Sequence, residues 1–340
     1  MATQDADGEK GGAQIQDTRR MARGLVLVVV ATAVLYAAFV FSADAGQVLA
    51  ALEQFPLWIL PAAVGLSFAN YVVRFVRWQM YCRRLGIVLE PRTSFVIHLS
   101  GLALTVSPGK MGEAFKSLLV RRISGTPISK SAPIVLAERF TDLLAFLLLI
   151  AVGAGAGESG ESWIVWSTLG LCAVLFALVT SVGLQRFALG LLGKRAFTAR
   201  FVPKLEVALV SSRTLLAPRA LFVPTLIAAV GWSLECYAFK LVAGAFVEGG
   251  VPFLFALYTF ALAAVAGAVA FIFPGGLGVT EASMGALLRR RYVASGLGIE
   301  AAAAAAVSAT ILIRLATLWF AVVIGIVAVL VFRRRHGGIT

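Results

Sequence analysis

The sequence predicts an all-α polytopic integral membrane protein with about seven spanning helices and two Pro-Gly re-entrant helical hairpins in an inverted repeat. Hydrophobic residues make up 60% of the chain and the mean hydropathy is +0.91, so its apolar runs cannot all be buried in one soluble core. One Pro-Gly phrase occurs twice, and each copy interrupts an apolar stretch. Basic residues lie beside the apolar segments and give a net charge of +13, which favours membrane orientation and headgroup contact over nucleic-acid binding.

The repeated phrase spans Ser107–Ala114 in its first copy and Phe273–Ala282 in its second. Proline removes a backbone donor and glycine relaxes the chain, so a helix ends at each copy. Each copy carries a glutamate, Glu113 or Glu281, and an arginine stands eight residues later. Paired interruptions of this kind indicate the midplane site of a transporter. The alternative is two ordinary loops that both use Pro-Gly.

Residues 1–23 are polar, and we expect them to form a disordered cytoplasmic N-terminus because Arg19, Arg20 and Arg23 precede the first apolar run. That run, Gly24–Ser42, opens the membrane domain predicted over residues 24–335. Ala43-Asp44-Ala45 resembles a signal-peptidase site, but the run is long for a signal peptide, so a retained anchor is favoured. The segment from there to Pro56 is predicted to be a loop on the outer side.

The first repeat is predicted over residues 57–152. It begins with a span over Leu57–Arg77 and ends with a span over Pro133–Val152. Between them Ser94–Ser107 is apolar but short, and its 14 residues reach only about 20 Å at the helical rise, against a hydrocarbon core of about 30 Å. The simplest explanation is a re-entrant hairpin with Pro108-Gly109 at its tip.

Residues 163–219 link the two repeats. Trp163–Gly183 is predicted to carry the chain inward after an acidic outer loop, and Gln185–Arg219 to be a basic amphipathic stretch on the inner leaflet.

The second repeat is predicted over residues 221–332, followed by a tail over residues 336–340. Its parts are a span over Leu221–Ala243, a hairpin over Val251–Leu288 and a span over Ala301–Phe332. The basic clusters Arg289–Arg291 and Arg333–Arg335 flank that last span, so both cannot be cytoplasmic. If the second hairpin is re-entrant from outside, the C-terminus is inside and the repeat is inverted, which we favour; if the hairpin crosses fully, the C-terminus is outside.

Lys110, Glu113 and Lys116 share one face of the returning half-helix, whose N-terminal amides point at the tip. Amides and a lysine together suit a phosphate. The alternative is that Glu113 and Lys116 only neutralise each other.

Glu138, Arg139 and Asp142 lie within the third span, where ionisable residues are functional candidates. Arg139 can reach Asp142 at i+3. The alternatives are that this cluster reaches the interface or only locks the helix. Arg314 lies deeper in the last span and needs an acidic or phosphate partner; we expect Glu281 to be its resting partner.

The remaining polar residues predict little chemistry. Glu235 and Lys240 are interpreted as separate helix–helix contacts, His98 as a packing residue, and the run Ala301–Ala306 as a close-packing face. Three cysteines without a CxxC pair and two histidines predict no metal site, and no cofactor is expected. Hydrolase, metalloprotease and nucleotide-binding motifs are absent from the sequence, so we expect no enzyme activity.

Three motifs in order resemble the lysylphosphatidylglycerol synthase transmembrane, or flippase-like, family. They are Pro108-Gly109-Lys110-Met111-Gly112-Glu113, Glu138-Arg139-Phe140-Thr141-Asp142 and Pro274-Gly275-Gly276-Leu277-Gly278-Val279-Thr280-Glu281. The resemblance covers about residues 20–335 and implies a lipid translocase fold. In fused members an aminoacyl-transferase domain follows; because this chain ends at Thr340, we expect it not to make a lysyl-lipid.

The expected function is therefore lipid translocation between leaflets, with an anionic phospholipid or a polyprenyl or glycolipid-type lipid as substrate. The alternatives are an accessory protein that presents lipid to a lipid-modifying enzyme and a transporter of small soluble anions. We expect a bacterial-type cytoplasmic (inner) membrane with the N-terminus in the cytoplasm, membrane lipids as partners, and a homo-oligomer or a lipid-synthesis enzyme as possible protein partners. The expected substrate-binding residues are Pro108, Gly109, Lys110, Gly112, Glu113, Lys116, Glu138, Arg139, Asp142, Pro274, Gly275, Gly278, Glu281 and Arg314.

Overall fold

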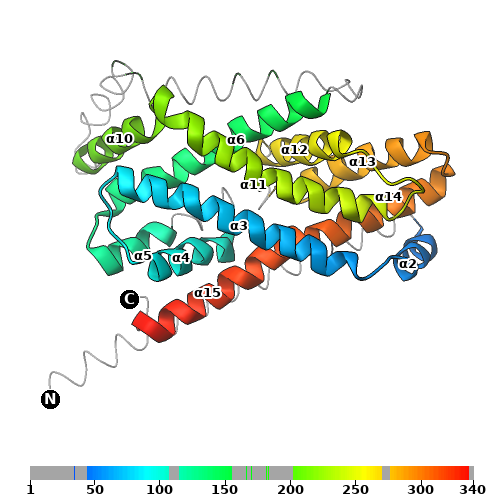
Figure 1. Ribbon diagram of the computed structural model, residues 1–340, viewed down its shortest axis with the longest axis horizontal. Coiled ribbons are helices and arrows are strands. Elements are labelled where there is room, and N and C mark those ends of the chain that lie inside the picture. The colour runs from blue at the N-terminus through cyan, green and yellow to red at the C-terminus, as the bar shows by residue number, and fades with distance from the viewer. Residues whose placement is uncertain are drawn as a thin grey trace.

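The computed structural model describes residues 44–106, 115–154, 202–269 and 276–336, together with the isolated positions 34, 166, 170, 181 and 183. Every element in these ranges is a helix (Figure 1). The N-terminal half contains α2 (Ala45–Glu53), α3 (Ile59–Arg84), α4 (Pro91–Ser100), the 3₁₀ helix η1 (Gly101–Leu104), α5 (Phe115–Ser124) and α6 (Ile128–Ala154). The C-terminal half contains α10 (Val202–Leu216), α11 (Pro218–Gly244), α12 (Phe253–Val269), α13 (Val279–Ala294), α14 (Ile299–Arg314), η4 (Leu315–Trp319) and α15 (Phe320–His336).

Three described helical segments are long and apolar enough to cross a membrane: Ile59–Arg84, Arg219–Gly244 and Ile299–His336. These segments coincide with the predicted second, fifth and last spans. The third predicted span lies in α6, which continues through Pro133 and carries several charged side chains. The predicted runs at 24–42 and 163–183 lie outside the described residues.

The last span is one helix in three parts. A π-helical segment, Leu315–Trp319, separates α14 from α15 and begins directly after Arg314. Single π-turns inside α-helices are frequent at functional sites because they shift the register of the side chains that follow.

Two pairs of short helices lie in opposite parts of the bundle. α4 packs against α5, and α12 packs against α13. Figure 1 shows the first pair in its left half and the second pair at the upper right. The chain between the members of each pair, residues 107–114 and 270–275, lies outside the described residues, so both Pro-Gly breaks do as well.

The two halves of the chain interlock. α3 packs against α11, α12 packs against α6, and α15 packs against α4 and η1. The last contact is very close, because a Cβ built on Gly325 of α15 would lie 2.0 Å from the backbone nitrogen of Ala103. Glycine is therefore required where α15 crosses η1.

The prediction of a loop before Pro56 is wrong, because residues 45–53 form a helix. Asp44 caps a helix there, because its side chain accepts hydrogen bonds from the backbone nitrogens of Gly46 and Gln47 at 2.9 and 3.3 Å. The resulting helix α2 packs on α14 by inserting Val48 beside Ala304 and Val307. Its apolar face therefore packs on a helix that lies far away in the sequence, with contacts between residues 253 positions apart.

The predicted basic stretch 185–219 contains a helix, α10, that packs against α6 and α11. Leu215 and Leu216 at its end are buried in the core shared with α3 and α6. The small-residue run in the last span packs closely as predicted, since Ala302, Ala304, Ala305 and Ala306 are all buried.

Candidate functional site

One carboxylate at the centre of the bundle receives several donors. Arg77 Nη1 donates to Asp142 Oδ1 at 2.8 Å, and Trp232 Nε1 donates to the same oxygen at 2.9 Å. Arg74 Nη2 and Arg139 Nη1 lie 3.4 and 3.5 Å from Asp142 Oδ2. Asp142 therefore joins three guanidinium groups from two helices, and the predicted i+3 contact from Arg139 is confirmed.

Helical spacing explains how this group assembles. Arg74 and Arg77 are three residues apart on α3, so both side chains leave the same face, and Arg139 and Asp142 have the same spacing on α6. Trp232 enters from α11, and the Arg74 guanidinium lies 4.9 Å from the centre of its indole ring. We call Arg74, Arg77, Arg139 and Asp142 the arginine cluster.

Arg74, Arg77 and Asp142 of the arginine cluster are buried, while the side chain of Arg139 is 26% exposed, and the two buried arginines are incompletely hydrogen-bonded. Arg77 is 0% exposed and Arg74 is 8% exposed. Within the described part of the chain, Arg77 Nε and Nη2 and Arg74 Nε have no hydrogen-bond partner. An arginine keeps its charge at any physiological pH and can only donate hydrogen bonds. These buried N–H groups are therefore donors that an anion could satisfy.

Lys116 and Glu138 form a second buried pair beside the cluster. Lys116 Nζ donates to Glu138 Oε2, and Nζ lies 4.6 Å from the centre of the Trp78 ring. The Lys116 side chain lies directly against Gly101 of η1. A side chain there would clash with it, because a Cβ on Gly101 would lie 2.7 Å from Lys116 Cδ. Whether Lys116 also neutralises Glu113 is not tested, because Glu113 lies outside the described residues.

Glu281 and Arg314 form the predicted pair between α13 and the last span. Arg314 Nε donates to Glu281 Oε1 at 2.6 Å, and the two residues are 9% and 1% exposed respectively. Glu281 Oε2 also accepts from the backbone nitrogen of Gly278 at 2.7 Å, so the same carboxylate fixes the start of α13. Arg314 Nη2 has no hydrogen-bond partner among the described residues.

A fourth buried carboxyl has a neutral partner. Asn70 Nδ2 on α3 donates to Glu235 Oε1 on α11 at 2.6 Å, and the two residues are 0% and 5% exposed. This contact confirms the interpretation of Glu235 as a helix–helix contact. Lys240 lies apart from it, with Nζ 5.2 Å from the centre of the Tyr237 ring on the same helix. His98 is also a packing residue, since it is buried against the Phe75 and Trp78 rings.

Of the predicted site residues, Lys116, Glu138, Arg139 and Asp142 come together, and Glu281, Gly278 and Arg314 form a separate group. The structure does not describe Pro108, Gly109, Lys110, Gly112, Glu113, Pro274 and Gly275. Sequence reasoning missed Arg74, Arg77 and Asn70, since the two arginines were taken as the cytoplasmic end of a span. Their spacing of i, i+4 and i+7 was the signal, because it places one amide and two guanidiniums on a single helix face.

A family model for the lysylphosphatidylglycerol synthase TM region matches residues 24–325. The chain belongs to that family. No curated protein matches the chain. The family and the three apolar spans make this a multi-pass helical membrane protein, and the match covers the transmembrane region of the synthases without their catalytic domain.

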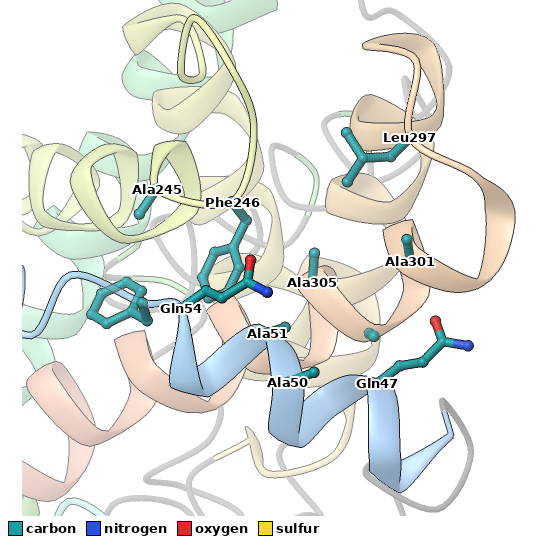
Figure 2. Close-up of a pocket in the computed structure, with 11 residues that line it drawn as sticks. Gln47, Ala50, Ala51, Gln54, Ala245, Phe246, Leu297, Ala301 and Ala305 are labelled. Carbon is teal, nitrogen blue, oxygen red and sulfur yellow. The ribbon is translucent and has the colours of Figure 1, made fainter.

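The described residues also form an open pocket of about 370 Å³ away from the charged groups (Figure 2). It lies between α2, the α11–α12 connection and α14, and alanines line much of it, with Gln47 on α2 and Gln54 just after its end. None of the predicted site residues lines it. Among the described residues no cluster of three or more His, Cys, Asp or Glu side chains could hold a metal ion.

Proposed function

We propose that this protein is a translocase for a membrane lipid with an anionic headgroup. The arginine cluster carries the proposal. Its three guanidiniums and one carboxylate give a formal charge of three minus one, or +2. The Lys116–Glu138 and Arg314–Glu281 pairs are each neutral, and ionised Glu235 lowers the total to +1. Lys110 and Glu113, outside the described residues, carry opposite charges and leave the sum unchanged.

Buried excess charge is expensive unless something compensates it. A phosphate is the natural partner, because guanidinium N–H groups match its oxygens in geometry as well as in charge. The unpartnered nitrogens of Arg77 and Arg74 are suitable donors for such a group. The headgroup would enter the bundle to meet them while the acyl chains remain in the bilayer.

The helix contacts support an inverted repeat over residues 57–152 and 221–332. In this scheme α3, α4, α5 and α6 correspond to α11, α12, α13 and the α14–α15 helix. α12 packs on α6, and α4 packs on α15, so each hairpin contacts the last helix of the other repeat. α3 and α11, which would be equivalent, pack on each other. Re-entrant hairpins from opposite sides would bring the two Pro-Gly tips toward the arginine cluster.

The ends of the helices support an orientation with the C-terminus inside. Arg122 Nη2 on α5 donates to the carbonyl of His336 at 3.1 Å, and Arg84 Nη1 on α3 donates to the carbonyl of Ala220 at 2.7 Å. These contacts gather arginine-rich ends of α3, α5 and α15 on one side. At the other side, Gln47 on α2 contacts Glu300 at the start of α14. We propose that the arginine-rich side faces the cytoplasm across an inner membrane.

The test is lipid translocation in proteoliposomes, using headgroup-labelled phosphatidylglycerol and phosphatidylcholine with an impermeant quencher. We expect wild-type protein to move phosphatidylglycerol between leaflets. The Arg77→Ala variant should do so at least about tenfold more slowly. Arg83→Ala is the matched control, because it removes an exposed arginine from the same helix. Competition by free glycerol phosphate distinguishes a lipid substrate from a soluble anion.

If wild-type protein moves no lipid while its fold is intact, the translocase proposal is wrong and the accessory role becomes the better interpretation. Equal rates for Arg77→Ala and Arg83→Ala would exclude the arginine cluster as the binding site.

A further inference from the structure

The buried carboxyls of the bundle differ in one respect, which is the charge of their partners. Asp142, Glu138 and Glu281 each form an ion pair with a lysine or arginine. Glu235 is buried like the others, but in the described part of the chain its hydrogen-bond partner is the neutral amide of Asn70. A buried carboxylate without a direct cation partner gains least from remaining ionised.

Asn70 can satisfy either protonation state of Glu235. In the ionised state Nδ2–H donates to Glu235 Oε1, as observed at 2.6 Å. Asn70 Oδ1 is a buried acceptor with no donor among the described residues. A protonated Glu235 has an O–H group that can donate to that oxygen after a small rotation of either side chain. Gly231 leaves room for the amide, since a Cβ there would lie 2.7 Å from Asn70 Oδ1.

Glu235 also lies where its charge affects the candidate anion site. The charged groups that act on it electrostatically are Arg74 on α3, Asp142 on α6 and Arg314 on α14, and Tyr71 and Cys236 are its titratable neighbours. α12, which also packs against α11, carries no charged residue. Arg74 belongs to the arginine cluster, so Glu235 faces both the cluster and the Arg314–Glu281 pair.

We propose that Glu235 is a proton-binding site that couples proton uptake to binding of the anionic headgroup, with Asn70 as its positioning residue. This proposal rests on the proposed function, because it assigns a role to the same site. Uptake of one proton from water converts the carboxylate to a carboxylic acid and removes one negative charge beside the cluster. The formal excess rises from +1 to +2, so an anion binds more tightly. By reciprocity the bound anion favours the proton.

The location fits a coupling element. Asn70 and Glu235 join α3 to α11, the first helices of the two proposed repeats, which pack on each other. Relative movement of the repeats would open this contact first to one side and then to the other. A proton taken up with the headgroup on one side would then leave with it on the other.

Two measurements on the full-length protein in phosphatidylcholine nanodiscs test the proposal. The first is binding of short-chain phosphatidylglycerol, whose phosphodiester does not change charge near neutral pH. We expect its affinity to fall by about tenfold as the pH rises through the wild-type transition, a size typical of coupled sites. Glu235→Gln mimics the protonated state and should bind with high affinity at every pH. Glu53→Gln, at the exposed end of α2, should behave like wild type.

The second measurement is infrared absorption of protonated carboxyl groups. Wild type should show a pH-dependent C=O band that is absent in Glu235→Gln and displaced to higher frequency in Asn70→Leu, which removes the hydrogen bond but keeps the acid. Absence of such a band in wild type, or its persistence in Glu235→Gln, overturns the proposal whether or not lipid binds. Unchanged pH dependence of binding in Glu235→Gln also overturns it. Failure of wild type to bind or move any lipid, with the band present, overturns the proposed function instead.

Discussion

Glu281 binds Arg314 and the start of its own helix with one carboxylate. Oε1 accepts from Arg314 Nε at 2.6 Å, and Oε2 accepts from the backbone nitrogen of Gly278 at 2.7 Å. Helix α13 is thereby tied to the last apolar helix at the residue that precedes its π-helical segment. A movement that shifts the π-segment must therefore act on α13 as well.

Arg314→Ala should destabilise the protein by about 3–5 kcal/mol, because it leaves Glu281 as a buried carboxylate without its cation. Thermal unfolding in detergent measures the change. The double variant Arg314→Met, Glu281→Gln should recover part of the loss, since neither charge then remains. Arg290→Ala, an exposed arginine on α13, is the control and should unfold like wild type. Equal unfolding temperatures for Arg314→Ala and Arg290→Ala would contradict the observed pairing.

Asp142→Asn should be more damaging than Glu138→Gln. Asp142 holds three guanidiniums and an indole N–H, so its loss raises the formal charge of the arginine cluster from +2 to +3, whereas Glu138 holds one lysine. We expect the free energy of unfolding to fall by about 3–5 kcal/mol in Asp142→Asn and by less in Glu138→Gln, as measured by thermal unfolding in detergent.

Anionic lipid provides a second observation on the same pair. Because the arginine cluster gains charge in Asp142→Asn, added phosphatidylglycerol should raise the unfolding temperature of that variant more than that of wild type. A stabilisation that does not depend on Asp142 would show that phosphatidylglycerol binds elsewhere.

Gly101→Ala should displace Lys116 from the Glu138 pair, because the new methyl would lie 2.7 Å from Lys116 Cδ. Overpacking of this kind costs about 1–3 kcal/mol. Gly65→Ala is the matched control: Gly65 is also helical, on α3, and no atom lies within 4 Å of the added methyl. That control should be neutral or stabilising, by up to about 1 kcal/mol. Lipid translocation should fall only in the first variant.

Gly278→Ala should weaken the start of α13. Gly278 has φ 88° and ψ −55°, a conformation that an L-residue adopts only with strain of about 1–3 kcal/mol. The observable is thermal stability, together with the rate of lipid translocation, since Glu281 accepts from this residue. Gly285→Ala, within the same helix and with its nearest neighbour at 3.8 Å, should be tolerated. Equal behaviour of the two variants would count against a structural need for glycine at 278.

The proposed orientation can be checked by labelling in intact cells. Glu248→Cys, on the exposed α11–α12 connection, should react with an impermeant maleimide from outside. Arg335→Cys, at the exposed end of α15, should react only after the membrane is opened. Reaction of both cysteines from outside would place the C-terminus outside and remove the inverted repeat, whereas the reversed pattern would invert the orientation of the whole protein.

Two contacts of the site could be predicted from the sequence, one from helical spacing and one from the need of a buried arginine for an acidic partner. The i+3 contact between Arg139 and Asp142 follows from helical geometry alone. The pair Glu281–Arg314 was predictable because a deep arginine needs an acidic partner and the second Pro-Gly phrase supplies one. The pairing of Lys116 with Glu138 was not, because it depends on how α5 is rotated against α6.

Hydropathy and the Pro-Gly breaks are local properties of the chain, so they suffice to identify a helical membrane protein, to locate most of its described apolar helices and to indicate the family it resembles. The contacts of Arg74 and Arg77 with Asp142 and of Asn70 with Glu235, and the helix that residues 45–53 form against α14, follow only from the folded structure. Those contacts depend on the rotation and height of helices from distant parts of the chain. Packing across the whole bundle sets the rotation and height of each helix, and neither can be predicted from a short stretch of sequence.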